Sequence, residues 1–116
     1  MLKPQNSLEL LKAVKNDNLL IKLIEQLNKD FQLSGIFKVF DINTSFDKLN
    51  EKLAEILINL IQFKYDDYLN LIYRVDISEK ELATIKNNNL VAVGNQIAFL
   101  ILKREFQKVW LKQNYN

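Results

Sequence analysis

The sequence predicts an all-α protein, a compact bundle of five to six helices that forms a single domain over residues 1–116. Apolar residues recur at intervals of three and four positions through most of the chain, which is the spacing of one helix face. Two glycines and one proline are too few for the frequent turns of a β-sandwich or barrel. The 116 residues, 48% hydrophobic and 26% charged, suit one folded domain.

The first two helices are predicted from caps and apolar spacing. Ser7 is expected to cap a helix over about 8–15, and the cluster at 16–18 (NDN) to end it and cap a second helix over 19–33. The second helix has an apolar face made by Leu20, Leu23, Ile24, Leu27 and Phe31. The Ser-Gly pair at 34–35 predicts its end, because glycine adopts the left-handed conformation that closes many helices.

The segment 36–43 (IFKVFDIN) lacks a helical period and is rich in β-branched and aromatic residues. We interpret it as a hydrophobic connection that lies over the core, with or without one extended stretch. A strand here would have no partner within the chain, so a sheet would require a second molecule.

Thr44 or Ser45 is predicted to cap a third helix over about 46–64. Its apolar stripe consists of Phe46, Leu49, Leu53, Ile56 or Leu57, Leu60 and Phe63. A break is expected at 64–67 (KYDD), where the aspartates favour a new helix N-terminus. A fourth helix is then expected over 67–75, with Leu69, Ile72 and Tyr73 facing inward.

The clearest local signal is the sequence SEKE at 78–81. Ser78 and Glu81 have the spacing of a capping box, and Ile77 and Leu82 that of a hydrophobic staple. They predict a short fifth helix that ends near residue 86.

A loop is expected at 87–89 (NNN), followed by a last helix over about 90–112. Gly94 disfavours the first turns of that helix, so its start is expected nearer Asn95. The helices over 46–64 and 90–112 are expected to form the centre of the bundle.

Two stretches, 56–61 and 97–102, are apolar on nearly every side of their expected helices. Such segments are either central in the bundle or covered by another chain, and the sequence leaves both readings open. The candidate interface residues are Ile56, Asn59, Leu60, Phe99, Ile101, Phe106 and Trp110. Asn59 would then be a buried polar group that needs a partner.

Positive charge comes mainly from lysine, and the chain has only two arginines, Arg74 and Arg104. A planar guanidinium suits bidentate pairing at the edge of a core. We expect at least one of them to be mostly buried and paired with a carboxylate from a different helix, with Asp76, Glu79 or Glu105 within reach. Two exposed arginines are the alternative.

The residue types restrict the chemistry. His and Cys are absent, which excludes histidine acid–base catalysis, Cys-His and Ser-His nucleophiles, and the metal sites that use those ligands. Five carboxylates crowd one stretch of the chain, without the spacing of a known metal loop: Asp66, Asp67, Asp76, Glu79 and Glu81. Helix-start charges explain most of them. We therefore expect no catalytic residues, no cofactor and no metal site.

The last helix interleaves basic and aromatic residues, namely Lys103, Arg104, Lys108 and Lys112 with Phe106, Trp110 and Tyr115. Such a face can bind single-stranded nucleic acid by phosphate contact and base stacking. The net charge of +2 is small for that role, and the aromatic spacing is that of an inward stripe. Nucleic-acid binding is therefore the alternative hypothesis.

No apolar run approaches the roughly 20 residues of a membrane span, and nothing in a cysteine-free chain requires an oxidising compartment. The leading hypothesis is a cytoplasmic, non-enzymatic helical module that forms a homo-oligomer or docks onto a protein partner.

The segments YRVDISEKEL at 73–82 and ILKREFQKVW at 101–110 resemble parts of short uncharacterised all-helical bacterial proteins. The resemblance spans 65–112, less than half of the chain. It implies a helical fold and no particular activity, cofactor or functional residue.

Overall fold

The computed structural model describes residues 4–86 and 89–115, and the described residues contain six α-helices and no strand. The helices are α1 (Ser7–Asn16), α2 (Leu20–Leu33), α3 (Phe46–Phe63), α4 (Tyr65–Val75), α5 (Glu79–Leu82) and α6 (Leu90–Tyr115). They form one compact bundle that measures 37 × 28 × 24 Å. The predicted all-α fold is confirmed.

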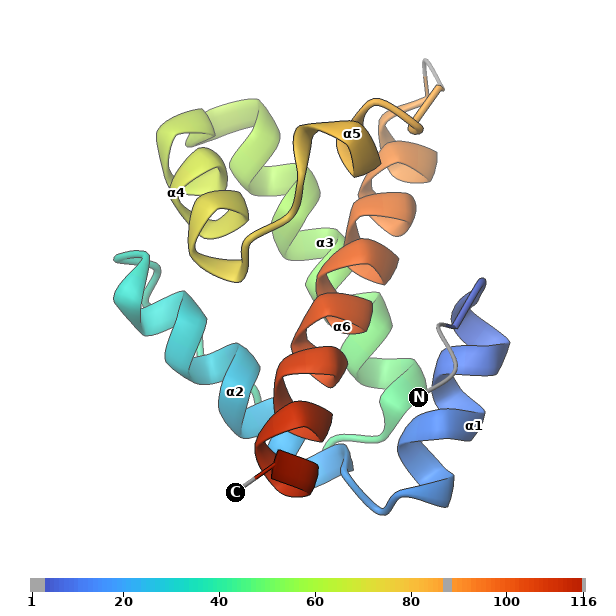
Figure 1. Cartoon of the computed structure of the whole chain (residues 1–116). Coiled ribbons are helices and arrows are strands. Elements are labelled where there is room, and N and C mark those ends of the chain that lie inside the picture. The colour runs from blue at the N-terminus through green and yellow to red at the C-terminus, as the bar shows by residue number, and fades with distance from the viewer. Residues whose placement is uncertain (1–3, 87–88, 116) are drawn as a thin grey trace.

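Helices α3 and α6 make the most extensive contact in the molecule, as expected for its centre. In Figure 1, α6 crosses the whole bundle, with α2 and α4 on one side and α1 on the other. Among the largest fully buried side chains are Leu53 and Leu57 of α3 and Ile101 and Phe106 of α6. The interior is therefore a single core, built around the two longest helices.

Glycine at position 94 permits the close approach of these two helices. It lies inside α6 and is buried, so the expected start near Asn95 is wrong. A Cβ at this position would lie 2.6 Å from Cγ1 of Ile58 and 3.3 Å from the carbonyl oxygen of Ala54. The helix therefore accepts the propensity cost of glycine because α3 occupies the space of a side chain.

Several predicted helix ends are confirmed. The Ser45 hydroxyl accepts a hydrogen bond from the backbone N–H of Lys48, and the Ser78 hydroxyl accepts one from that of Glu81. Gly35 has φ +80°, the left-handed conformation expected after α2. These ends depend on neighbouring residues, which is why local sequence predicts them.

Other predicted ends are wrong. Asn6, not Ser7, caps α1 by accepting from the backbone N–H of Glu9, and no side chain caps α2. Helix α5 ends at Leu82 instead of near residue 86, whereas α6 continues to Tyr115. The first two positions of the loop predicted at 87–89 lie outside the described residues.

Three residues that were expected to face inward are exposed, and they lie near the junction of α3 and α4. Phe63 is 74% exposed at the last residue of α3, and Tyr73 and Leu69 of α4 are exposed as well. The buried residues of α4 are Tyr68, Leu71, Ile72 and Val75. Helix α4 begins at Tyr65, directly after Lys64, so this short junction sets which face of α4 is turned toward the core. That face differs from the expected one.

Candidate interaction surface

One amide side chain holds the connection between α2 and α3 against the bundle. Asn28 of α2 donates from Nδ2 to the carbonyl oxygen of Phe40 at 2.9 Å, and its Oδ1 accepts from the Phe40 N–H at 2.7 Å. Phe40 is buried and packs edge-on against Phe31, with 5.3 Å between ring centroids. Ile36 is buried too, so both ends of the stretch 36–40 are anchored.

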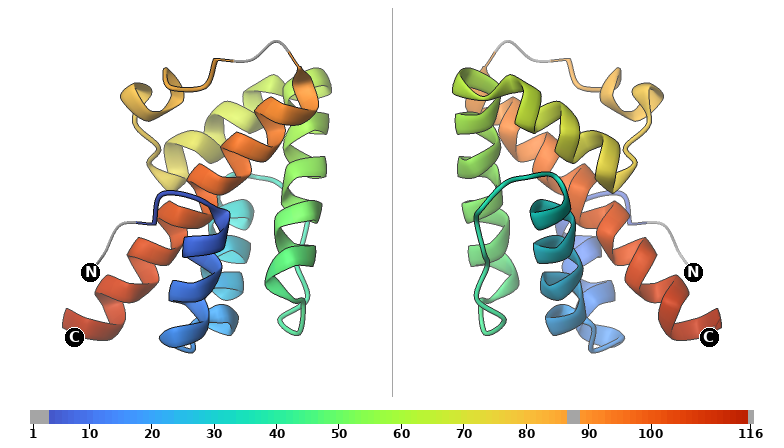
Figure 2. Two further views of the ribbon diagram at one scale, coloured as in Figure 1. Left: turned by 90° about the vertical axis from the view of Figure 1, so that its right-hand side faces the viewer. Right: turned by 90° about the vertical axis from the view of Figure 1, so that its left-hand side faces the viewer.

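The apolar side chains between these anchors face outward. Phe37 is 92% exposed and Val39 is 85% exposed. Within the described part of the chain, the backbone N–H and C=O groups of residues 37–39 make no hydrogen bond. Figure 2 shows this connection on the outside of the bundle between α2 and α3. The expected hydrophobic connection is confirmed, but its middle is presented to the surroundings.

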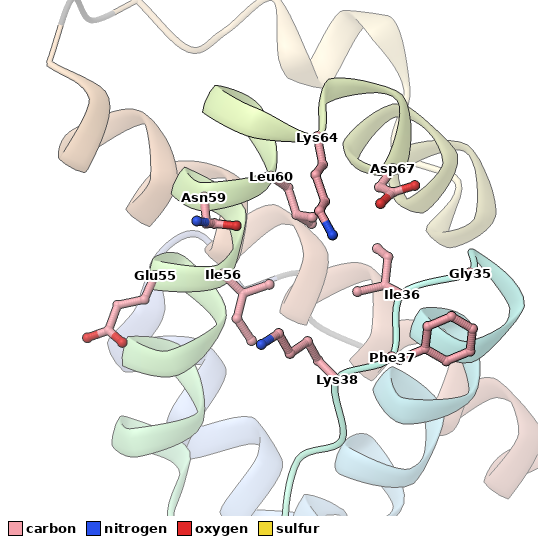
Figure 3. Close-up of a pocket in the computed structure, with 10 residues that line it drawn as sticks. All are labelled: Gly35, Ile36, Phe37, Lys38, Glu55, Ile56, Asn59, Leu60, Lys64 and Asp67. Atoms are coloured by element: carbon pink, nitrogen blue, oxygen red, sulfur yellow. The ribbon is translucent and has the colours of Figure 1, made fainter.

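A hollow of about 360 Å³ lies between this connection and α3 (Figure 3). We call it the α3 groove. It is lined by Gly35, Ile36, Phe37, Lys38, Glu55, Ile56, Asn59, Leu60, Lys64 and Asp67. A second hollow, of about 550 Å³, lies on the α2 side of the same connection and is lined by residues that include Asn28, Lys29 and Val39. The exposed stretch is therefore a ridge between two hollows.

Three of the candidate interface residues, Ile56, Asn59 and Leu60, line the α3 groove. Asn59 is exposed, so the chain's own core does not bury it. Leu60, Ile101 and Phe106 are buried in the chain's own core, where internal packing accounts for them. Phe99 and Trp110 are partly buried at the edge of that core.

The arginines lie at the periphery. Arg104 donates to Asp76 over 3.4 Å, with the two side chains 29% and 79% exposed. Arg74 is exposed and forms no side-chain ion pair with the described residues. Glu105, one of the carboxylates expected within reach of the arginines, lies 3.3 Å from Lys108 instead. Arg104 is therefore mostly covered and pairs with Asp76 at the C-cap of α4, whereas Arg74 is exposed.

A buried charged cluster that was not expected from the sequence joins α2 to α6. The Nζ of Lys108 lies 2.9 Å from Oδ2 of Asp30 and 3.3 Å from Oε1 of Glu105. It also donates to the carbonyl oxygen of Arg74 at 3.3 Å, while Gln26 donates to Asp30 at 3.3 Å. The sequence could have indicated this cluster by a charged residue within an apolar stripe. Asp30 is such a residue, because it follows Leu27 by three positions on the inward face of α2.

The two carboxyl groups of this cluster titrate in opposite directions. Burial, together with the hydrogen bond and charge of Asp30, raises the pKa of Glu105 to about 9 against the opposing effect of Lys108. Burial also acts to raise the pKa of Asp30, but hydrogen bonds from Glu105, Lys108 and Gln26 outweigh it and lower that pKa below 3.8. As a carboxylate, Glu105 has no hydrogen-bond donor at either oxygen among the described residues, whereas a protonated Glu105 can donate to an ionised Asp30.

The basic face of α6 is partly engaged inside the chain. Lys108 belongs to the buried cluster, Arg104 pairs with Asp76, and Phe106 is fully buried. Lys103 lies over the ring of Phe99 at 5.9 Å. These contacts remove several groups from the surface that nucleic-acid binding would use.

The crowded carboxylates at 66–81 do not form a metal site. Among residues 4–86 and 89–115, no three potential ligands of the His, Cys, Asp or Glu type come together in a way that could hold an ion.

None of the helices among the described residues combines the length and apolar character that crossing a bilayer requires.

Comparison with known proteins adds no relative: no family model matches the chain, and neither a curated protein nor a solved structure is significantly similar to it.

Proposed function

We propose that this chain is a non-enzymatic helical module that binds another protein through the connection between α2 and α3. The observation that carries the proposal is the exposure of Phe37 (92%) and Val39 (85%) on an anchored segment, where the backbone groups of residues 37–39 make no hydrogen bond to the described residues. Large apolar side chains that stand out next to a hollow are typical of binding surfaces. The adjacent α3 groove gives a partner side chain a place to enter.

The chemistry of the chain supports a binding role over catalysis. The sequence has no His or Cys, and the carboxyl groups of Asp30 and Glu105 are buried and line neither hollow. Reactive groups must reach a substrate, and these face each other and Lys108 instead. A cytoplasmic location is part of the proposal, since a chain without cysteine needs no oxidising compartment.

The test compares partner capture by the wild-type chain with capture by a Phe37→Ser, Val39→Ser double variant, read by quantitative mass spectrometry. A partner retained by wild type and lost by the double variant is expected. The matched control is Tyr73→Ser, which removes an apolar side chain that is 86% exposed on α4. Equal capture by all three chains, or by none, would contradict the proposal.

Light scattering identifies a partner that is a second copy. A homo-oligomer of the wild-type chain has a multiple of the 13.7 kDa chain mass. If the partner is a second copy, the double variant should have the mass of a single chain.

A further inference from the structure

We infer that the stretch 37–39 accepts an extended, acidic peptide segment of a partner protein as an added β-strand in the α3 groove. The inference rests on the proposed function and specifies how the partner is held. It follows from the direction of the backbone groups, the shape of the groove and the charges that point into it.

The hydrogen bonds of Asn28 fix the direction of the backbone. In an extended chain, the N–H and C=O of one residue point to the same side, and those of the next residue to the opposite side. Asn28 binds both groups of Phe40 from the α2 side. The corresponding groups of Lys38 therefore point toward α2, and those of Phe37 and Val39 point toward α3.

The side chains follow the same two-residue period. Ile36 and Phe40 face the bundle and are buried, whereas Phe37 and Val39 face outward. Lys38 has the position of the inner set in this period but is exposed, and its side chain reaches along the α3 groove toward Ile56 in Figure 3. The segment therefore has the geometry of a single strand with an open edge.

The open edge faces α3, where Phe37 lines the α3 groove; Val39 also borders the hollow on the α2 side. Phe37 and Val39 offer two N–H donors and two C=O acceptors, spaced as a neighbouring strand requires, and none is used within the described part of the chain. The floor beneath is apolar, formed by Ile36, Ile56 and Leu60. An added strand would bond to this edge and place alternate side chains on the floor.

The charges in the groove favour an acidic occupant. In Figure 3 the ammonium group of Lys64 points into the groove and that of Lys38 lies along it. Of the two carboxylates that line the groove, Glu55 points away and Asp67 lies beyond Lys64, on the side away from Lys38. Neither lysine forms an ion pair with the described residues. An Asp or Glu side chain on the added strand would lie between two cations.

The test uses a phage-displayed library of random linear peptides, selected on the wild-type chain. The expected binders alternate apolar residues around an Asp or Glu. On binding of a selected peptide, the amide protons of Phe37 and Val39 become protected from exchange, and that of Lys38 does not. A basic consensus, or the absence of any selected binder, would overturn the inference.

Proline substitutions test the backbone edge directly, because proline removes one N–H donor. Val39→Pro removes a donor on the edge that faces α3 and should weaken peptide affinity about tenfold. Lys38→Glu and Lys64→Glu should also weaken it, by removing the cations. The matched control, Lys38→Pro, removes the donor that points to α2. Lys38→Pro is compared with Lys38→Ala, because both variants lack the lysine charge. The two variants should bind the selected peptide with the same affinity.

The outcomes separate this inference from the proposed function. If the double variant of Phe37 and Val39 loses its partner but Val39→Pro does not, the module binds proteins by side chains alone. The inference of an added β-strand is then wrong. If light scattering shows a dimer that Val39→Pro dissociates, the edge pairs with a second copy of the chain. This result would contradict the inference that a peptide of another protein occupies the groove. Circular dichroism of each variant checks that the helices persist.

Discussion

The ammonium group of Lys108 lies 2.9 Å from the carboxylate of Asp30, a residue 78 positions earlier in the chain. This contact fixes α6 to α2 at a site where Glu105 is completely buried. Removing water from a carboxyl group disfavours its charged form, so the cluster holds its proton on Glu105 and its negative charge on Asp30.

The raised pKa of Glu105 predicts that stability falls as pH rises from about 4.5 to about 9. In that window the folded chain binds a proton that the unfolded chain has lost, so the free energy of unfolding decreases by up to about 1.4 kcal/mol per pH unit. Urea denaturation at several pH values measures this slope. Glu105→Gln should flatten it, and the exposed Glu25→Gln should not. Equal slopes in all three chains would contradict the cluster's proton arrangement.

The lowered pKa of Asp30 acts at the acid end. Its stabilising contribution is present above its unfolded pKa, near 3.8, and is lost as pH falls through the lower folded value. Asp30→Asn should therefore reduce the acid sensitivity of stability below pH 4 while lowering stability at neutral pH. Denaturation at pH 2 to 4 provides the measurement, and an unchanged acid limb would count against this assignment.

Core truncation distinguishes internal burial from an interface. Leu60→Ala and Ile101→Ala should each cost about 2–5 kcal/mol, because both side chains pack inside the chain. Phe63→Ala, on the same helix as Leu60 but 74% exposed, should change stability by less than about 0.5 kcal/mol. Losses below about 1 kcal/mol at both core positions would mean that the central helices are misplaced.

Gly94→Ala should destabilise the protein by about 1–3 kcal/mol although alanine favours helices, because the new Cβ would overlap Ile58. In an Ile58→Ala background the same change should become neutral or stabilising, since the nearest obstructing side chain is gone. A double-mutant cycle by chemical denaturation measures the coupling. Stabilisation of the wild-type background would show that the helices are less closely packed.

Arg74→Lys and Arg104→Lys should each cost less than about 1 kcal/mol, because exposed ion pairs contribute little and Asp76 is 79% exposed. Lys108→Met removes a partner of two buried carboxyl groups and should cost about 3–5 kcal/mol. Thermal or urea unfolding compares the three variants. A larger loss at Arg104 than at Lys108 would reverse the assigned roles.

The sequence alone determined where most helices lie and what ends several of them. Ser45, Ser78 and Gly35 act on backbone groups within a few residues, so their effect is readable without the fold. The apolar stripes of α2 and of most of α3 follow from the 3.6-residue period for the same reason.

The tertiary structure decided what depends on residues far apart in the chain. The packing of α6 on α2 brought Lys108 to Asp30, and the short junction at Lys64 turned Tyr73 outward. The outward position of Phe37 depends on Asn28 of α2, which binds the backbone of Phe40 and so sets the direction of the segment. Local periodicity specifies which side of a helix is apolar, but only the crossing of helices fixes which apolar and charged groups are covered and which stay accessible to a partner.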